Sequence, residues 1–180
     1  DFIVRYVPFG MSKRAEHYKL VDPFCLFYLR FVSGGRNIGP HFWQQNTSSQ
    51  PVVTWRGLAF ENVCFNHVDQ IKAALGVLGV ISTSSTWSKR ADDETGAQID
   101  LLISRNDNVV NMCEIKYYGG DFAVDKDYYK VLLGRQQLLM KSVSPKMTIH
   151  STLITTFGLK HNEYANAFTN VVILDDLFRF

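Results

Sequence analysis

The sequence predicts a mixed α/β fold, in which helices flank a central sheet of mixed strand direction. Apolar residues recur at three- and four-residue spacing, the helical period, over residues 55–78 and again over 125–141. Five further runs have the length and the bounding turn residues of strands, namely 79–87, 98–104, 109–117, 147–156 and 170–174. The core elements are therefore expected in the order α-β-β-β-α-β, followed by a last strand.

Composition excludes several classes of protein. The chain has 180 residues, 46% of them apolar, and 19 Lys and Arg against 17 Asp and Glu give a net charge of +2. This profile is typical of a globular protein and not of a disordered one. No apolar run approaches the ~18 residues of a membrane span, and the first residues do not form a secretory signal. We therefore expect no membrane partner.

The cysteines indicate the compartment. Cys25, Cys64 and Cys113 are odd in number, form no CxxC motif and stand alone in apolar stretches. Such a pattern is typical of reduced core thiols and not of a disulfide framework. We therefore expect a cytoplasmic protein.

Residues 1–32 are expected to be the end of a domain that begins earlier in a longer polypeptide. Residues 2–7 and 16–21 have the pattern of two strands joined by a loop. Because a lone hairpin is only marginally stable in water, we expect its domain to begin before this chain. Residues 24–32 follow Asp22-Pro23, and their dense aromatic content predicts a buried helix.

Residues 33–54 are predicted to be a linker between this remnant and a second domain, residues 55–180. The segment is polar around residues 46–50, and its five turn-forming residues are Gly34, Gly35, Gly39, Pro40 and Pro51. Phe42 and Trp43 are candidates to anchor the linker by packing.

Four charged residues interrupt apolar elements of the second domain, where charge is costly. Glu61 lies in the first helix, Asp100 in the strand 98–104, and Glu114 and Lys116 in the strand 109–117. A buried carboxylate must be paired, metal-bound or at an exposed edge. Glu114 and Lys116 are two residues apart and so point to the same face of their strand.

The register of the predicted hairpin decides whether Asp100 lies beside Glu114. In an antiparallel pair the two residue numbers have a constant sum, and these two residues meet if Ser104 pairs with Val110. That register leaves a loop of odd length, such as residues 106–108. A two-residue turn would place the carboxylates on opposite faces unless a bulge lies near Asp100. We therefore predict the odd-length loop or the bulge.

Two adjacent carboxylates repel each other, and a divalent cation between them relieves the repulsion. Mg²⁺, or Mn²⁺ in its place, suits such a site because it takes one or two carboxylates and keeps bound waters. Asp100 and Glu114 are then the metal ligands, and Glu61 completes the shell through water. Lys116 would orient the attacking water or neutralise developing charge. The alternative is structural: Glu114 and Lys116 form an ordinary salt bridge, and Asp100 pairs with an arginine.

At these residues the sequence resembles the PD-(D/E)XK nuclease superfamily, whose restriction-endonuclease-like core has the order α-β-β-β-α-β. The phrases WRGLAFE, GAQIDLLI, CEIKYY and TTFGLKHN look closer still to the nuclease-like domain at the C-terminus of archaeal-type AAA ATPases, over roughly residues 55–178. In that family a P-loop ATPase and a winged helix precede the domain. The opening hairpin and YKLVDPFCLFYLRFV look like the end of the winged helix. This chain has no P-loop motif of its own.

The resemblance implies roles residue by residue. Glu61 matches the acid of the first helix, Asp100 and Glu114 the metal carboxylates, and Lys116 the catalytic lysine. Ile99 stands where the name of the motif has proline, a common departure in the superfamily. The candidates for substrate binding are Gln98, Lys89, Arg90 and, on the second helix, Gln136, with Arg135 and Tyr129 as alternatives there.

The activity that the resemblance implies is Mg²⁺-dependent hydrolysis of DNA phosphodiester bonds, attached to an ATPase module of the same polypeptide. DNA and that module are the expected partners, and a homo-oligomer is compatible with the ATPase resemblance. The alternative is a non-catalytic nuclease-like domain that binds DNA or docks on the ATPase. His67, six residues after Glu61, is expected to be a hydrogen-bonded packing histidine and not a metal ligand.

Overall fold

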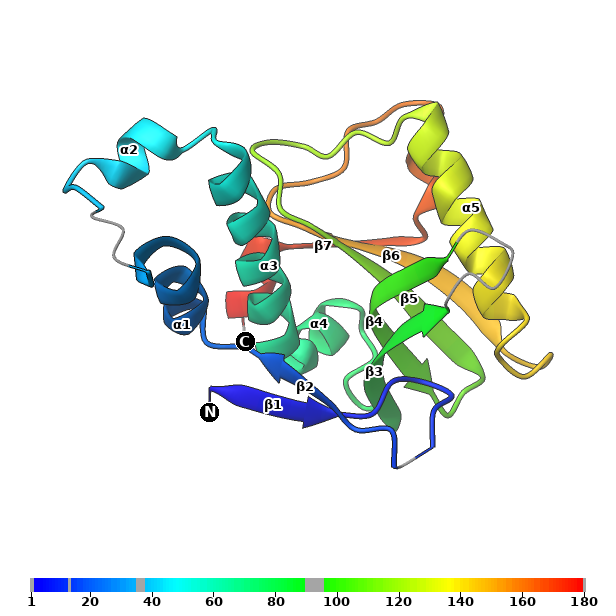
Figure 1. The fold of residues 1–180 in the computed structure, drawn as a ribbon. Coiled ribbons are helices and arrows are strands. Elements are labelled where there is room, and N and C mark those ends of the chain that lie inside the picture. The colour runs from blue at the N-terminus through cyan, green and yellow to red at the C-terminus, as the bar shows by residue number, and fades with distance from the viewer. Residues whose placement is uncertain (1, 13, 35–37, 90–95, 180) are drawn as a thin grey trace.

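A five-stranded sheet forms the centre of the computed structural model, which describes residues 2–12, 14–34, 38–89 and 96–179 (Figure 1). The strand order is β3-β4-β5-β6-β7. Strands β3, β4 and β5 are antiparallel neighbours, and β6 and β7 run parallel to β5. The strands are β3 Ser82–Lys89, β4 Ala97–Arg105, β5 Val109–Lys116, β6 Thr148–Thr155 and β7 Asn170–Ile173.

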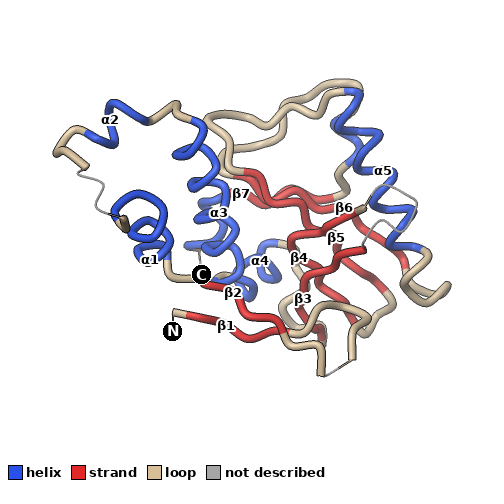
Figure 2. Tube along the Cα trace, in the orientation of Figure 1, coloured by secondary structure: helices blue, strands red, loops and turns tan. Residues whose placement is uncertain are grey.

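Helices cover both faces of this sheet. Helices α3 (Gln50–Asn66) and α4 (Val68–Ala74) pack on one face of the sheet. There Phe60 and Ile71 belong to the same core cluster as Leu101 of β4. Helix α5 (Lys126–Met140) packs on the other face through Leu139 and Leu132. Figure 2 shows these helices on either side of the strands. The predicted α/β class, with a mixed central sheet flanked by helices, is confirmed.

The first part of the chain forms a separate hairpin and a short helical segment. Strands β1 (Ile3–Tyr6) and β2 (His17–Leu20) pair only with each other among the described strands. Helix α1 (Pro23–Phe27) continues into a π-helical turn, Tyr28–Val32, so the predicted helix is present, but the expected burial is wrong, because Phe31 is the buried residue of this segment and Phe24 is exposed. The hairpin loop is tied to the central sheet, because the backbone N–H of Phe9 donates to Thr86 of β3 at 2.8 Å.

The predicted linker is partly helical, and the first predicted helix has different bounds. Helix α2 (Phe42–Asn46) lies inside residues 33–54, and α3 begins at Gln50. Pro51 was interpreted as a breaker, but proline in the first turn of a helix lacks only an N–H that has no partner there anyway. The helix predicted over 55–78 also divides at His67, whose backbone leaves the helical region at φ −121°.

An aromatic cluster holds the linker segment against α1 and α3. Phe42 and Trp43 contact Phe27 and Trp55 with ring centroids 5.4 to 6.5 Å apart. Aromatic pairs at such distances stabilise beyond the area they bury. The anchoring role predicted for Phe42 and Trp43 is therefore confirmed.

Two further expectations concern side chains away from the candidate site. The three cysteines are free, and Cys64 and Cys113 are buried as predicted, whereas Cys25 is only half-buried. The Nδ1 atom of His67 lies 2.7 Å from the carbonyl of Val63, and its ring packs against Phe178, which confirms the packing role. No helix in the described part of the chain has the length and hydropathy needed to cross a membrane.

Candidate functional site

The β4–β5 hairpin has the register that brings Asp100 toward Glu114. Leu101 pairs with Cys113, and the three-residue connection between the strands ends at Asn108. Asn108 has φ +64°, the left-handed conformation that closes a three-residue hairpin loop built on a type I turn. Continued by one residue, the register sets Asp100 opposite Glu114, and the predicted odd-length loop is confirmed.

The two strands separate at this point, and Asp100 turns its carboxylate toward the opening. The ladder ends one residue before Asp100, and the backbone N–H of Ile115 donates to Asp100 Oδ2 at 3.3 Å. On its other side, the pairing of β4 with β3 shifts by one residue between Ser85 and Trp87, so that Asp100 and Leu101 together lie opposite Thr86 in a β-bulge. This bulge lies between β3 and β4, whereas the predicted alternative was a bulge between β4 and β5; in the β4–β5 pair the odd-length loop sets the register.

Glu114 is enclosed and surrounded by donors. Its side chain is 0% exposed, and Arg135 Nη1 lies 2.6 Å from both carboxylate oxygens. The hydroxyl of Tyr128 donates to Oε2 at 2.9 Å, and Lys116 Nζ lies 3.7 Å from the same oxygen. The predicted pairing of Glu114 with Lys116 is therefore present, but Arg135 is the nearer cation.

The charge of Glu114 changes the pKa of both neighbours on α5. Burial raises the pKa of Tyr128, and the adjacent carboxylate raises it further. Burial lowers the pKa of Arg135, but its hydrogen bond and charge pairing with Glu114 outweigh this and raise the pKa overall. Arg135 therefore faces Glu114 as a charged guanidinium, the donor of a strong hydrogen bond.

Of these two residues on α5, the sequence analysis named Arg135 only as an alternative to Gln136 for substrate binding, and it did not select Tyr128. Arg135 and Tyr128 are seven residues apart, two helical turns, so they lie on the same face of α5. That spacing was the available signal. Gln136, the residue selected on this helix, is half-buried, and no hydrogen bond joins it to Asp100 or Glu114 among the described residues.

The environment of Asp100 differs from that of Glu114, because none of the described cations pairs with its carboxylate. Burial raises its pKa, and the charge of Glu114 raises it further, although Lys116 and Arg135 oppose this at longer range. No Lys, Arg or His of the described residues lies within ion-pairing distance of Asp100. The arginine partner that the structural alternative required is thus not found there.

Glu61 approaches Asp100 from the other face of the sheet. It lies on α3, and Lys19 of β2 contacts its Oε2 at 3.5 Å. Burial raises the pKa of Glu61, and the charge of Asp100 raises it further. The three acids therefore form a row with Asp100 in the middle, Glu61 paired to Lys19 at one end and Glu114 paired to Arg135 at the other.

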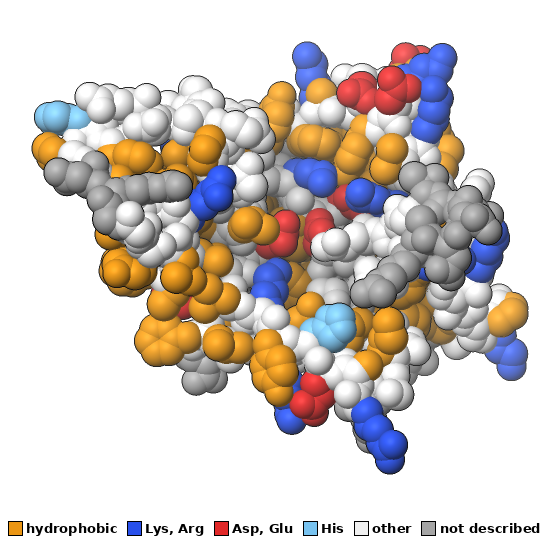
Figure 3. All heavy atoms as spheres, in the orientation of Figure 1, with side chains coloured by type: hydrophobic (Ala, Val, Ile, Leu, Met, Phe, Trp, Pro, Cys, Tyr) orange, Lys and Arg blue, Asp and Glu red, His pale blue; other side chains and the backbone are white. Residues whose placement is uncertain are grey.

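The row opens into a cleft of about 350 Å³ between the N-terminal hairpin and the sheet. Asp100, Glu61 and Gln98 line it from the sheet and α3, and Lys19 and Tyr18 line it from β2. Figure 3 shows acidic side chains beside basic ones in a hollow of this face. Asp100 and Glu61 are thus the acids that reach solvent through the cleft.

The remaining substrate-binding candidates are dispersed. Gln98 is exposed in the cleft, two residues from Asp100, as predicted. Lys89 is exposed at the end of β3 but does not line the cleft. Arg90 lies outside the described residues.

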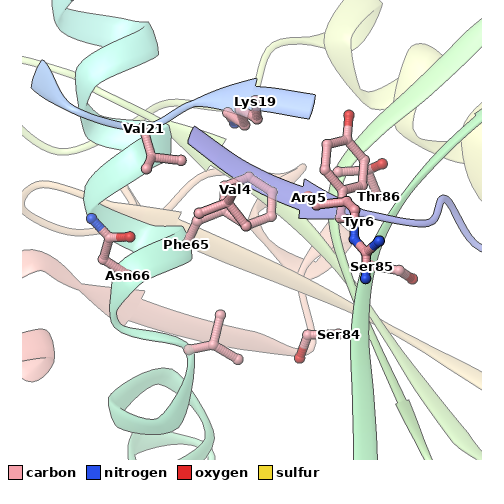
Figure 4. Close-up of a pocket in the computed structure, with 11 residues that line it drawn as sticks. Val4, Arg5, Tyr6, Lys19, Val21, Phe65, Asn66, Ser84, Ser85 and Thr86 are labelled. Atoms are coloured by element: carbon pink, nitrogen blue, oxygen red, sulfur yellow. The ribbon is translucent and has the colours of Figure 1, made fainter. Parts of the chain in front are cut away.

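A second cavity, of about 260 Å³, lies beside the cleft and shares Lys19 with it. Figure 4 shows Val4 of the hairpin beside Phe65 of α3, with Lys19 above them and Ser85 of β3 to the right. The ammonium of Lys19 lies 4.0 Å from the centre of the Phe65 ring, a cation–π contact. Lys19 therefore joins the hairpin to α3 through both Phe65 and Glu61.

The donors present fit a divalent cation held by two carboxylates. Asp100 and Glu114 offer the hard oxygen atoms that Mg²⁺ takes, with water in the remaining positions. The expected three-acid shell is not assembled, because within residues 2–12, 14–34, 38–89 and 96–179 no group of three or more His, Cys, Asp or Glu side chains is arranged to hold a metal. Glu61 is engaged by Lys19 instead.

Comparisons with known proteins add nothing to this geometry, because no protein-family model, curated protein or solved structure matches the chain. The resemblance to PD-(D/E)XK nucleases therefore stays a prediction from motifs, and the functional argument depends on the residues described above.

Proposed function

We propose that this chain is a Mg²⁺-dependent phosphodiesterase domain that acts on DNA, with Asp100 and Glu114 as the metal ligands. The observation that carries the proposal is the environment of Asp100. This carboxylate is largely buried, stands opposite a second carboxylate, has no cation at ion-pairing distance among the described residues and borders a cleft. Such an arrangement costs stability and is typical of a site that awaits a ligand.

The chain's own residues have defined tasks in this reaction. The bound cation would lower the pKa of a water molecule and neutralise charge that develops on the phosphoryl oxygens. Lys116, on the same face as Glu114, would hold the attacking water or balance the developing charge. Gln98, exposed in the cleft, would contact the substrate. Tyr128 keeps the Glu114 carboxylate in one orientation through its hydroxyl.

The order of the elements supports the finer assignment of the fold. A helix is followed by three antiparallel strands, a second helix and a strand parallel to the third, with both acids on the second and third strands. A restriction-endonuclease-like core of this order would belong to the larger protein that the resemblance implies. In that larger protein an ATPase module would precede residues 1–32. The protein would be cytoplasmic and would be able to form a homo-oligomer.

Cleavage of supercoiled plasmid DNA tests the activity. We expect nicking with Mg²⁺ or Mn²⁺, none with EDTA, and a loss of about 10²–10³-fold for Lys116→Ala, the cost of removing one group that stabilises transition-state charge. Lys130→Ala is the matched control, since Lys130 is an exposed lysine on α5 that pairs with Asp127. Equal nicking by Lys116→Ala and wild type would assign the activity to a contaminant and contradict the proposal.

A second candidate is a non-catalytic domain that binds DNA or docks on the ATPase module. The enclosure of Glu114 favours it, because Arg135 and Tyr128 already contact both oxygens of that carboxylate. In that case DNA binding would be the same in EDTA and in Mn²⁺, and no divalent cation would support cleavage.

A further inference from the structure

The contact of Arg135 with Glu114 leaves part of the guanidinium available for a second partner. All its described hydrogen bonds to Glu114 use one atom, Nη1, which lies 2.6 Å from each oxygen. A guanidinium pairs most strongly with a carboxylate through two nitrogens side by side, and this end-on contact leaves its other N–H groups unused by Glu114. The Arg135 side chain is also 25% exposed, whereas Glu114 is fully enclosed.

The charges around the pair balance without a metal. Glu114 and Asp100 contribute two acids, and Arg135 and Lys116 contribute two cations on the same side of the sheet. A divalent cation bound to the two acids would bring the same two positive charges that Arg135 and Lys116 already supply. Arg135 would then face a carboxylate already neutralised, while the phosphodiester that enters the site brings a new negative charge.

Tyr128 allows Glu114 to keep its place when Arg135 moves. Its hydroxyl donates to Oε2 at 2.9 Å and carries no charge that competes with a cation. Lys116 is a weaker partner for Glu114, because its ammonium is 3.7 Å away and also lies 5.5 Å from the centre of the Tyr128 ring. Arg135 is thus the group whose contact with Glu114 a metal ion has to replace.

We propose that Arg135 is a resident counter-ion that holds Glu114 in the metal-free site and binds the substrate phosphate once a metal is present. This inference rests on the proposed function. It adds a residue that the sequence motif does not contain and assigns it a ligand, the phosphodiester group. Arginine suits this task because its remaining N–H groups match the oxygens of a phosphate.

Two measurements on Arg135→Gln separate this role from a purely structural one. Calorimetric titration with Mn²⁺ should show binding about tenfold tighter than wild type, because the competing cation is gone. Binding of a short DNA duplex, followed by fluorescence anisotropy in Ca²⁺, should be about tenfold weaker, because the phosphate loses its partner. An arginine that only locks the fold would weaken both.

Two further variants complete the test. Lys130→Gln, which removes an exposed cation from the same helix, should leave both affinities within about twofold of wild type. Arg135→Lys keeps the charge without the planar fork, so it should recover folding if Arg135→Gln does not fold. It should bind Mn²⁺ as wild type does, because a competing cation remains, and bind DNA more weakly, because an ammonium does not match two phosphate oxygens at once.

The outcomes are distinguishable. If wild type binds no Mn²⁺, the proposed function fails and this inference fails with it. If wild type binds Mn²⁺ but the folded Arg135→Gln variant binds it equally or less tightly, or if Arg135→Lys binds DNA as tightly as wild type, the role proposed for Arg135 is wrong and the proposed function stands.

Discussion

At the scale of single residues, Asp100 is an acid taken largely out of water that has no cation at ion-pairing distance among the described residues. Its pKa is raised by burial and by Glu114, so the folded protein holds this proton more tightly than the unfolded chain does. An acid whose pKa is raised by folding stabilises the fold at low pH, and this contribution is lost as the pH rises from the ordinary aspartate range through the raised pKa. Asp100 therefore lowers the stability of the fold at neutral pH.

Replacing this carboxylate by an uncharged side chain should stabilise the protein. We expect Asp100→Asn to raise the free energy of unfolding at pH 7 by on the order of 1 kcal/mol, since the amide oxygen still accepts from Ile115 without a charge. The difference should shrink as the pH falls through the raised pKa and vanish at about pH 3, below the ordinary aspartate pKa, where the folded and the unfolded chain both carry this proton. Urea unfolding at the two pH values measures this, and a less stable variant at pH 7 would show that the Asp100 charge is compensated.

At the scale of elements, the β4–β5 hairpin carries the site, and its register depends on its loop. Three residues connect the strands, and Asn108 closes the loop with φ +64°. Asparagine tolerates the left-handed region better than other residues that carry a Cβ, because its short side chain can hydrogen-bond locally. The three-residue loop also sets the register that places Asp100 opposite Glu114. The conformation of the turn thus positions two acids that lie several residues away from it along the strands.

The loop offers a direct test. Asn108→Ala should lose about 1 kcal/mol of unfolding free energy, because alanine adopts the left-handed backbone region less readily than asparagine does. Asn108→Gly should stay close to wild type, since glycine adopts this conformation freely. Asn106→Ala, in the same exposed loop but without positive φ, is the matched control. Denaturant unfolding ranks the three, and equal losses for the alanine variants would contradict this account of the register.

The elements also show which features local sequence could predict. Strand bounds and hairpin register follow from side-chain alternation and loop length, which are properties of neighbouring residues, and these predictions are confirmed. The helical residues of the linker segment were not predicted, because Pro51 alone does not reveal whether it stands inside or before a helix. Arg135 was passed over for Gln136 because the rotation of α5 on the sheet is fixed by packing of residues such as Leu132 and Leu139, far away in sequence.

At the scale of the whole molecule, the row of acids lies where three parts of the chain meet. Helix α3 contributes Glu61 from one face of the sheet, and α5 contributes Arg135 from the other (Figure 1). The N-terminal hairpin contributes Lys19, which pairs with Glu61. Asp100 lies between these parts where β4 and β5 separate. A ligand bound at Asp100 would therefore connect both helical layers through one site.

Calorimetric titration of Mn²⁺ into wild type and Asp100→Asn tests the central claim most directly. Asp127→Asn serves as the matched control, because Asp127 is an exposed acid on α5 outside the row. The account predicts one Mn²⁺ per chain for wild type and for Asp127→Asn, and binding at least about tenfold weaker for Asp100→Asn. Equal affinity in all three proteins, or no binding by wild type, would contradict it.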